Sequence, residues 1–568
     1  MPAPLGVQKT SSAKFSTLVI ALTICRNIWC RQAFTVNARE RELLEIFGIE
    51  QDPRECPQCR HWRRAMFKGK VAFHRRKSSK SGVEFISSYP AEAPFPVYTL
   101  QEWWADDWDP TQFGASIDLE DAFFPQFKKL YLNVPKAGSL NNKTENCEYS
   151  VYATDSKNAY YSDVVAHSQD IYYCENITGH CEMLCDCLRC SECGGLYECV
   201  ECQACRDSSF LLSCSTSWEC HYCFDCIGCH HCLFSYNRRN ASYLFENRQL
   251  TPVEYEDVRA RVVDGSAPTQ EECRGKWKAL LKKASWPALR MVLCEACTGN
   301  ALAHCCGCRD CYNCVNSEDC HHSVELGASE LTRSNLDVTM GGTSELVYNT
   351  ILHGASNYFV RMCLRCRGST NLTYCIDCFS CQDCFGCTGL RRKRYCILNR
   401  EYSPQEYYST QSALIEQMKE AGEWGEFFPA DISLYGYNLS MAMNYFPLSR
   451  EEALARGSQW DDGPQTQNVS DGEASSEAPA GEDEALCCER SARRFRITSK
   501  ELAFYRRRQL PLPRLHPDLR MNERRALLLP WRVWRRECSS CGLEIDAAFD
   551  REDKRRVLCS TCYDRLFS

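Results

Sequence analysis

Large apolar or aromatic side chains recur at a fixed spacing through the middle of the chain. The spacing is 12 residues with one step of 14, and both features occur in two separate stretches. A period of this length is too short for a helical hairpin or a propeller blade, but it suits one coil of a narrow β-solenoid. The pattern therefore predicts two stacks of coils; the alternative is a string of irregular zinc knuckles whose spacing imitates a period. The expected apolar columns are Tyr160, Tyr172, Leu184, Leu196, Phe210, Tyr222 and Phe234 in the first stretch, and Tyr312, Val324, Leu336, Tyr348, Val360 and Tyr374 in the second.

The two stretches are copies of one another. Residues 222–255 align with residues 374–407 without a gap, at an offset of 152. A proline preceded by Thr251 or Ser403 follows each copy, and this pairing is typical of a helix N-terminus. We therefore expect helices over 252–263, 269–283 and 404–421.

These patterns predict a mainly β chain with small α parts, in which terminal zinc ribbons flank a duplicated, cysteine-rich, β-solenoid-like region with helical linkers. A polar stretch rich in Ser, Gly, Pro and acidic residues after 456 predicts a disordered linker. The expected units are an N-terminal zinc-ribbon-like module (20–80), an aromatic and acidic connecting segment (81–150), a first cysteine repeat array (151–250), a helical linker (251–293), a second array (294–402), a helical segment (403–456), the acidic linker (457–486), an arginine-rich degenerate ribbon (487–536) and a C-terminal zinc ribbon (537–568).

Cysteine content points to metal chemistry. The chain has 43 cysteines among 568 residues, an odd number that disulfides within one chain cannot pair completely. Most of them lie in C-x-x-C steps, which favour metal chelation or redox chemistry over structural crosslinks.

The clearest metal motif closes the chain. Two C-x-x-C knuckles, separated by a stretch long enough for a short hairpin, supply four thiolates, the ligand set of a closed, structural Zn²⁺ site. A looser motif with one x4 spacing lies near the N-terminus. The predicted zinc ligands are Cys538, Cys541, Cys559 and Cys562 at the C-terminus and Cys25, Cys30, Cys56 and Cys59 at the N-terminus.

Residues 488–525 resemble a second copy of residues 30–64. In this copy Ser491 and Leu519 occupy expected ligand positions. We therefore expect this degenerate ribbon to have lost its metal.

The central cysteines follow a period of three. Because three divides twelve, thiols of successive coils are expected to align in columns that can share metal ions. Zinc sites, iron–sulfur clusters and unliganded buried thiols are all consistent with this pattern. The predicted ligands are Cys187, Cys190, Cys199, Cys202, Cys223, Cys226, Cys229 and Cys232 in the first array, and Cys305, Cys308, Cys311, Cys314, Cys363, Cys366, Cys375, Cys378, Cys381 and Cys384 in the second.

Charge is unevenly distributed. The net charge of −7 excludes a uniformly basic protein that coats nucleic acid. Beyond the acidic linker, however, arginines alternate with Tyr505, Trp531 and Trp534, a combination that can bind phosphate and stack on bases. A solvated surface, or pairing with the acidic linker, is the alternative. The arginines predicted to bind nucleic acid are Arg493, Arg494, Arg506, Arg507, Arg508, Arg532, Arg535 and Arg536.

The chain has no run of 18 apolar residues, so no membrane contact is expected. The apolar run Phe15–Ile24 resembles a secretion signal, but no small-x-small cleavage site follows it. We expect a cytoplasmic protein, with secretion as the minor alternative.

Several motifs together resemble a known group. CPQCRHWRRAMF, YTLQEWWADDWDPTQFG and CFGCTGLRRKRYCILNREYSPQEY are similar to motifs of an uncharacterised family of cysteine-rich proteins from environmental bacterial genomes, especially candidate lineages. The resemblance covers about residues 25 to 562. It implies terminal zinc-ribbon-like modules around a cysteine-repeat centre, and it implies no established activity.

No phosphate-binding glycine loop, HExxH, G-x-S-x-G or Rossmann glycine pattern is present. The sequence therefore favours a non-enzymatic scaffold with several zinc ions that binds RNA, DNA or a ribonucleoprotein. A protein-interaction scaffold and an iron–sulfur or thiol redox protein are the alternatives.

Overall fold

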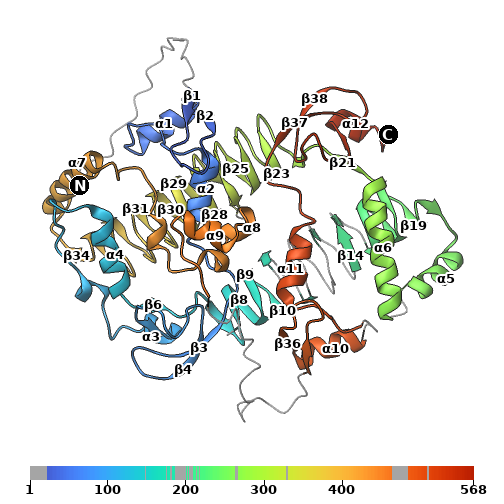
Figure 1. Cartoon of the computed structure of the whole chain (residues 1–568), viewed down its shortest axis with the longest axis horizontal. Coiled ribbons are helices and arrows are strands. Elements are labelled where there is room, and N and C mark those ends of the chain that lie inside the picture. The colour runs from blue at the N-terminus through green and yellow to red at the C-terminus, as the bar shows by residue number, and fades with distance from the viewer. Residues whose placement is uncertain are drawn as a thin grey trace.

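The computed structural model describes residues 22–147, 149–173, 175–178, 182–185, 200, 202–203, 209–212, 214–215, 218–262, 266–327, 330–462, 484–507 and 511–567. Strand makes up 32% and helix 26%, as the mainly β prediction with smaller α parts expected. Figure 1 shows two stretches of stacked strands, with the N- and C-terminal parts of the chain packed against them.

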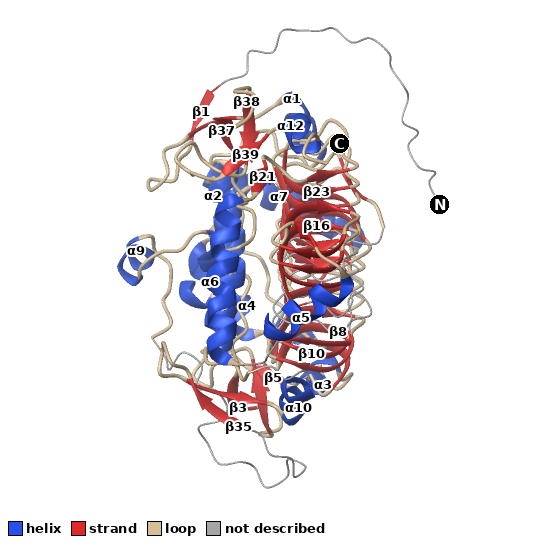
Figure 2. Cartoon of the chain, turned by 90° about the vertical axis from the view of Figure 1, so that its right-hand side faces the viewer, coloured by secondary structure: helices blue, strands red, loops and turns tan. Residues whose placement is uncertain are grey.

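The first array stacks short strands in parallel and ends in one antiparallel pair. Ser150 pairs with Ser162, and Cys220 pairs with Cys232, so each coil advances the chain by the predicted period. Figure 2 shows these strands stacked in a column. The strands are β7 (Asn142–Glu145), β8 (Ser150–Tyr160), β9 (Ser162–Ala166), β10 (Gln169–Tyr172), β11 (Glu175–Thr178), β12 (Glu182–Cys185), β13 (Cys202–Gln203), β14 (Ser209–Leu212), β15 (Cys214–Ser215), β16 (Trp218–Ile227), β17 (His230–Leu233), β18 (Tyr236–Arg239), β19 (Ser242–Phe245) and β20 (Arg248–Gln249).

Left-handed backbone explains the period of three. Tyr222, Asp225, Gly228 and His231 have φ values of 55°, 48°, 66° and 52°, and this positive φ recurs at every third residue through long parts of both arrays. Each such residue turns the chain by one corner, and four corners complete one coil. The residue after each corner faces the centre of the coil, which is why cysteines at this spacing are buried.

The second array has the same construction with three irregular steps. Met291 pairs with Leu302, an offset of 11. Val324 pairs with Thr339, an offset of 15, and Ser344 pairs with Asn357, an offset of 13. The regular step predicted from Val324 is therefore wrong, because residues after 326 add to that coil. The predicted steps from Tyr348 to Val360 and from Val360 to Tyr374 are also wrong, because Tyr348 pairs with Arg361 and Val360 pairs with Leu372. The strands are β22 (Met291–Val292), β23 (Gly299–Ala303), β24 (Cys311–Val315), β25 (Ser317–Glu318), β26 (Val324–Leu326), β27 (Thr332–Arg333), β28 (Leu336–Gly341), β29 (Ser344–His353), β30 (Asn357–Arg361), β31 (Thr370–Thr373), β32 (Gln382–Phe385), β33 (Arg394–Ile397) and β34 (Arg400–Glu401).

The predicted helices after each array are confirmed. Thr251 Oγ1 accepts from the Glu254 backbone N–H, and Ser403 forms a capping box with Glu406, so both predicted caps exist. The helical elements after the arrays are α5 (Pro252–Val262), α6 (Ala267–Lys283), α7 (Pro404–Ala421), α8 (Ala442–Tyr445) and α9 (Arg450–Ala455).

The N-terminal module is a chain of hairpins and short helices. Its strand β5 pairs in parallel with β6, just before the first array. Of the predicted apolar run, the described residues Leu22–Ile24 form a strand, but Leu22 and Ile24 are exposed, not buried. The elements are β1 (Leu22–Ile24), β2 (Ala33–Thr35), α1 (Ala38–Ile46), α2 (Pro57–Ala65), β3 (His74–Lys77), β4 (Glu84–Ser87), β5 (Val97–Tyr98), α3 (Leu100–Trp104), α4 (Phe123–Asn133) and β6 (Lys136–Ala137).

The C-terminal module has a similar order of elements. Most of the predicted acidic linker lies outside the described residues, but its last residues belong to a strand, and Arg450 pairs with Asp462 at its start. The elements are β21 (Ser285–Pro287), which pairs with the last strand, and β35 (Glu484–Cys487), β36 (Arg494–Ile497), α10 (Ser499–Arg507), α11 (Pro517–Arg525), β37 (Trp534–Glu537), β38 (Glu544–Ala547), β39 (Arg556–Leu558) and α12 (Ser560–Asp564).

Each terminal module packs on an array. Helix α2 contacts β28 and β29 of the second array, and α11 lies beside the first (Figure 1). No helix in the described part of the chain is long and apolar enough to cross a membrane.

Candidate metal centres

The N-terminal site joins a hairpin to a helix. Cys25 and Cys30 lie in the connection between β1 and β2, Cys56 is the N-cap of α2, and Cys59 lies in its first turn. All four Sγ atoms lie within 4.8 Å of one another, and Cys30 Sγ is 3.7 Å from Cys56 Sγ. Cys25, Cys56 and Cys59 are buried. This arrangement gathers the four ligands predicted from sequence, including the x4 pair.

The C-terminal site has the same construction. Cys538 and Cys541 lie in the turn between β37 and β38, Cys559 is the N-cap of α12, and Cys562 lies in that helix. Their four Sγ atoms also lie within 4.8 Å of one another, with Cys541 Sγ 3.9 Å from Cys559 Sγ. The sequence predicted two knuckles here; the second proves to be the first turn of a helix.

Local donors stabilise thiolates at both sites. A hydrogen bond from the Cys59 thiol is the largest of the contacts that lower the pKa of Cys56 to about 5. Burial raises the pKa of Cys538, but the backbone N–H groups of Cys541 and Cys559 outweigh burial and lower that pKa to about 6. Both helix N-termini add a partial positive charge beside the sulfur atoms. Each group therefore offers one thiolate near neutral pH, the form that binds a metal ion, while contacts with neighbouring thiols raise the pKa of Cys59 and Cys562.

Helix α2, which carries Cys59 of the N-terminal site, also forms buried ion pairs with the second array. Arg60 Nε lies 2.7 Å from Asp337 Oδ2, and Arg64 Nη1 lies 3.4 Å from Asp337 Oδ1, with all three side chains buried. His61 on the same helix contacts Thr339 at 3.1 Å. The hairpin–helix connection at the four N-terminal cysteines thus fixes the helix that docks on the second array.

The C-terminal site fixes a contact with the first array. The Tyr563 hydroxyl on α12 donates to Asp225, and Asn237 donates its side-chain amide to the same hydroxyl at 3.1 Å. Arg239 lies over the Phe567 ring, 3.8 Å from its centroid. The helix at the N-terminal site thus contacts the second array, and the helix at the C-terminal site contacts the first.

The central cysteines line the insides of the coils. Cys375 Sγ donates to the carbonyls of Thr373 and Cys384, at 3.4 and 3.5 Å, and Cys220 Sγ donates to the Cys229 carbonyl at 3.4 Å. Within the described residues, three or more Cys, His, Asp or Glu ligand atoms gather within 4.8 Å only at the two terminal sites. Carbonyl contacts of this kind recur at the described central cysteines Cys223, Cys226, Cys229, Cys232, Cys305, Cys308, Cys311, Cys314, Cys363, Cys366, Cys378, Cys381 and Cys384.

Metal binding by the central cysteines stays a prediction. Burial raises the pKa of Cys311 and Cys320, which favours the neutral thiol there, whereas hydrogen bonds from neighbouring thiols lower the pKa of Cys229 to about 3 and that of Cys381 to about 4. Cys187, Cys190 and Cys199 lie outside the described residues, and for Cys202 the structure describes only the backbone.

The predicted nucleic-acid-binding arginines differ in environment. Arg494, Arg506, Arg507 and Arg532 are exposed, and Arg508 lies outside the described residues. Arg493 and Arg535 pair with Asp518 and Asp546. Arg536 is buried and donates to the backbone carbonyls of Asp550 and Asp553, so it supports the C-terminal hairpin from within.

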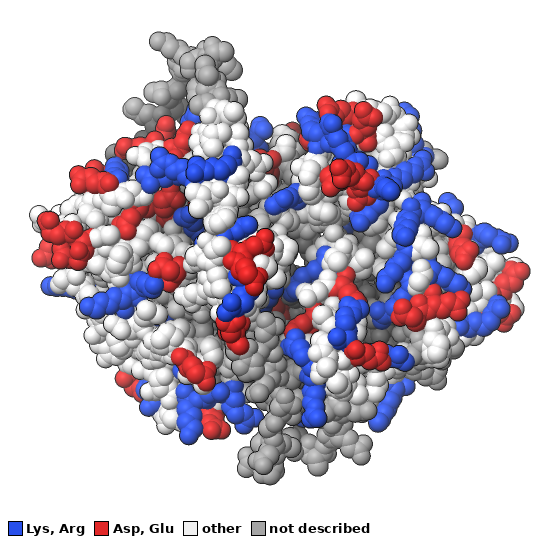
Figure 3. All heavy atoms as spheres, in the orientation of Figure 1, with Lys and Arg blue, Asp and Glu red and all other residues white. Residues whose placement is uncertain are grey.

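Positive charge does not dominate the face shown in Figure 3, where basic and acidic side chains are interspersed.

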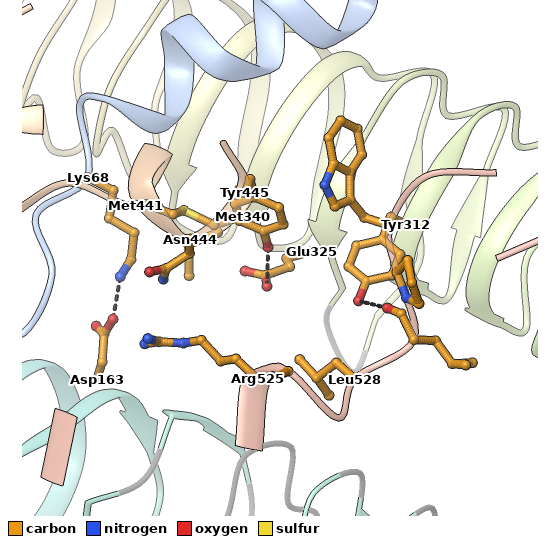
Figure 4. Close-up of a pocket in the computed structure, with 14 residues that line it drawn as sticks. Lys68, Asp163, Tyr312, Glu325, Met340, Met441, Asn444, Tyr445, Arg525 and Leu528 are labelled. Carbon is orange, nitrogen blue, oxygen red and sulfur yellow. Dashed lines mark hydrogen bonds and ion pairs between the residues drawn. The ribbon is translucent and has the colours of Figure 1, made fainter. Parts of the chain in front are cut away.

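A cavity of about 290 Å³ lies where both arrays and both terminal modules meet. Lys68 and Asp163 form an ion pair at one end, and Glu325 accepts from the Tyr445 hydroxyl at 2.7 Å (Figure 4). The Arg525 side chain extends from α11 toward this space. Since these acidic groups pair with side chains from other units, the cavity is a junction between modules.

Sequence motifs did not reveal the residues that dock the modules. Asp337 and Asp225 lie inside the repeats without any distinctive local pattern, and their partners are hundreds of residues away.

Comparison with known proteins adds no relative: no family model, curated protein or solved structure matches this chain.

Proposed function

We propose that the protein is a non-enzymatic scaffold in which structural zinc ions hold two terminal modules against a β-solenoid-like centre. The observation that carries this proposal is the convergence of four cysteine Sγ atoms within 4.8 Å at each end of the chain. Four-thiolate sets favour Zn²⁺, and a closed set leaves no open coordination position for catalysis.

The positions of the sites support a structural role. At each end the ligands come from one hairpin and one helix, and that helix carries the side chains that contact an array. A metal ion that fixes the hairpin to the helix would therefore fix that helix in its docked position.

The centre supports the scaffold proposal in a second way. In the described parts of the arrays, coils with buried side chains at every third position form long, regular surfaces without a catalytic constellation. Iron–sulfur chemistry in these coils is the alternative; iron in the purified protein, with visible absorption, would favour it.

We further propose that the exposed arginines of the C-terminal module bind nucleic acid, in the form of single-stranded RNA. Arg506 and Arg507 lie together at the end of α10, and Arg494 lies on the neighbouring strand β36. Exposed arginines can bind phosphates without the desolvation cost that a buried guanidinium pays.

The experiment compares two triple variants of the full chain in RNA-binding titrations at several salt concentrations. R494A/R506A/R507A should reduce the magnitude of the slope of log affinity against log salt by about 2, at roughly 0.7 per lost phosphate contact. K278A/K282A/K283A, which removes the same charge from exposed positions of α6, should leave the slope nearly unchanged.

Absence of RNA binding by the wild-type chain at low salt would contradict this assignment. An equal loss in both variants would show that only general charge matters. If the wild-type chain retains partner proteins after nuclease treatment and the arginine variant loses them, the ligand of these arginines is a protein and not RNA.

A further inference from the structure

The two terminal modules repeat the same elements in the same order, and from α2 onward the repeated elements lie at one constant offset along the chain. Individual contacts repeat as well: the Val97 N–H donates to Ser79 Oγ at 3.0 Å, and the Val557 N–H donates to Ser539 Oγ at 3.1 Å. The equivalent elements, which all begin at the same offset from one another, are α2 and α11 (from Pro57 and Pro517), β3 and β37 (from His74 and Trp534), and α3 and α12 (from Leu100 and Ser560).

Further equivalent contacts confirm the alignment. The Arg76 guanidinium donates to the Pro90 carbonyl at 2.8 Å, and Arg536 donates to the Asp550 carbonyl at the same distance. The modules also begin alike, since the turn after β1 is matched by the turn after β35. Each module therefore contains two metal positions, one after its first hairpin and one after its second.

The second position of the N-terminal module contains no cysteine. In the C-terminal module this position holds Cys538, Cys541, Cys559 and Cys562. The equivalent residues of the N-terminal module are Ser78, Ser81, Thr99 and Glu102.

These four side chains form a hydrogen-bonded cluster. Ser78 Oγ donates to Glu102 Oε2, and the same carboxylate oxygen accepts from the Thr99 N–H at 2.9 Å. Thr99 Oγ1 in turn accepts from the Glu102 N–H at 3.2 Å. The corresponding contact at the metal site is the Cys562 N–H to Cys559 Sγ, at 3.4 Å.

We propose that Ser78, Ser81, Thr99 and Glu102 replace a metal site by hydrogen bonds, with the Glu102 carboxylate joining the hairpin to the helix as the metal ion does at the equivalent C-terminal position. The inference rests on the proposed zinc sites. A carboxylate suits this place because it is a single anionic group that can accept from several donors at once.

The C-terminal module shows the reciprocal replacement. At its first position Cys488 is kept from the ligand set and His516 stands in place of Cys56. Ser491 and Leu519 stand where the N-terminal module has Cys30 and Cys59. Leu519 packs with Phe495 and Leu502 in an apolar cluster around Cys488. Each module thus keeps one metal position, and the retained position differs between them.

The decisive experiment restores the lost site. The full-length variant S78C/S81C/T99C/E102C should bind one zinc ion more per chain than the wild type, measured by elemental analysis of the purified chain. It should also give one additional tetrahedral thiolate spectrum on Co²⁺ titration. The single variant E102C is the matched control and should bind no extra ion.

The outcomes separate the two proposals. If wild-type protein holds zinc and the folded quadruple variant gains none, the replacement inference fails while the zinc sites stand. If wild-type protein holds no zinc at its terminal cysteines, the proposed function fails first.

A second measurement, on wild-type protein, tests the inference even if the quadruple variant does not fold. In wild-type protein, chelator treatment should expose residues 22–60 and 537–565 to limited proteolysis and leave residues 78–104 protected. Cleavage within 78–104 on metal removal would overturn the inference, because this region should be held without metal.

Discussion

The docking of α2 on the second array depends on one buried carboxylate. Asp337 faces both Arg60 and Arg64, and the exposed fractions of the three side chains are 0%, 6% and 0%. Burial lowers the pKa of Arg64 to about 10, which leaves it charged at neutral pH. Asp337→Ala would leave two buried guanidinium groups without their shared counter-ion.

The expected cost follows from this geometry. Breaking a buried ion pair by removing one partner costs about 3–5 kcal/mol, because the remaining charge stays desolvated. Since every 1.4 kcal/mol is tenfold, opening of α2 should become roughly 100- to 3,000-fold more frequent.

Hydrogen exchange of the α2 amides measures this opening directly. The control is Glu318→Ala, which removes an exposed pair with Arg333 on the same array and should cost roughly 0–1 kcal/mol. Equal exchange rates in the two variants would refute the reasoning. So would faster exchange spread evenly over the chain, because the effect should be strongest in the N-terminal module.

Two further predictions concern other buried positions. Burial raises the pKa of Glu40, but the nearby His321 and His322, whose ring nitrogens lie 3.9 and 3.1 Å from Glu40 Oε1, outweigh burial and lower this pKa to about 2. At pH values above 4.5, its ordinary pKa, the carboxylate therefore contributes about 3 kcal/mol to the free energy of unfolding. This contribution is lost as the pH falls toward 2. Denaturation midpoints at pH 7 and pH 3 should differ less for Glu40→Gln than for wild type; an unchanged difference would exclude this role. Gly386→Ala should lower the thermal midpoint more than Gly82→Ala. Both residues have positive φ, but only the first would place a Cβ 2.7 Å from a phenylalanine ring. Equal shifts would mean that backbone strain alone decides the cost.

The spacing of many paired strands in the two arrays could be predicted from the sequence. The long period of apolar side chains matches the parallel register of Ser150 with Ser162, and the period of three in the cysteines matches the spacing of left-handed corners. Both signals survive in sequence because each coil repeats the same local geometry. The irregular step after Val324 could not be predicted, since the inserted residues do not disturb the apolar spacing nearby.

Only part of the terminal modules could be predicted from the sequence. Cysteine spacing located both four-thiol groups, because these ligands must keep their chemistry. It missed the second N-terminal position, where Ser78, Ser81, Thr99 and Glu102 preserve the geometry with different atoms. The docking of each module also depends on contacts such as Arg60 with Asp337, which join residues far apart in the sequence and leave no local pattern.

The most direct test of the scaffold account is the zinc content of matched variants. Elemental analysis should show that the double variant Cys59→Ser/Cys562→Ser holds two zinc ions fewer per chain than the wild type, one for each terminal site. Cys306→Ser, at an exposed cysteine outside both groups, should keep the wild-type content. Equal zinc in the double variant and the wild type, or no zinc in either, would contradict the account.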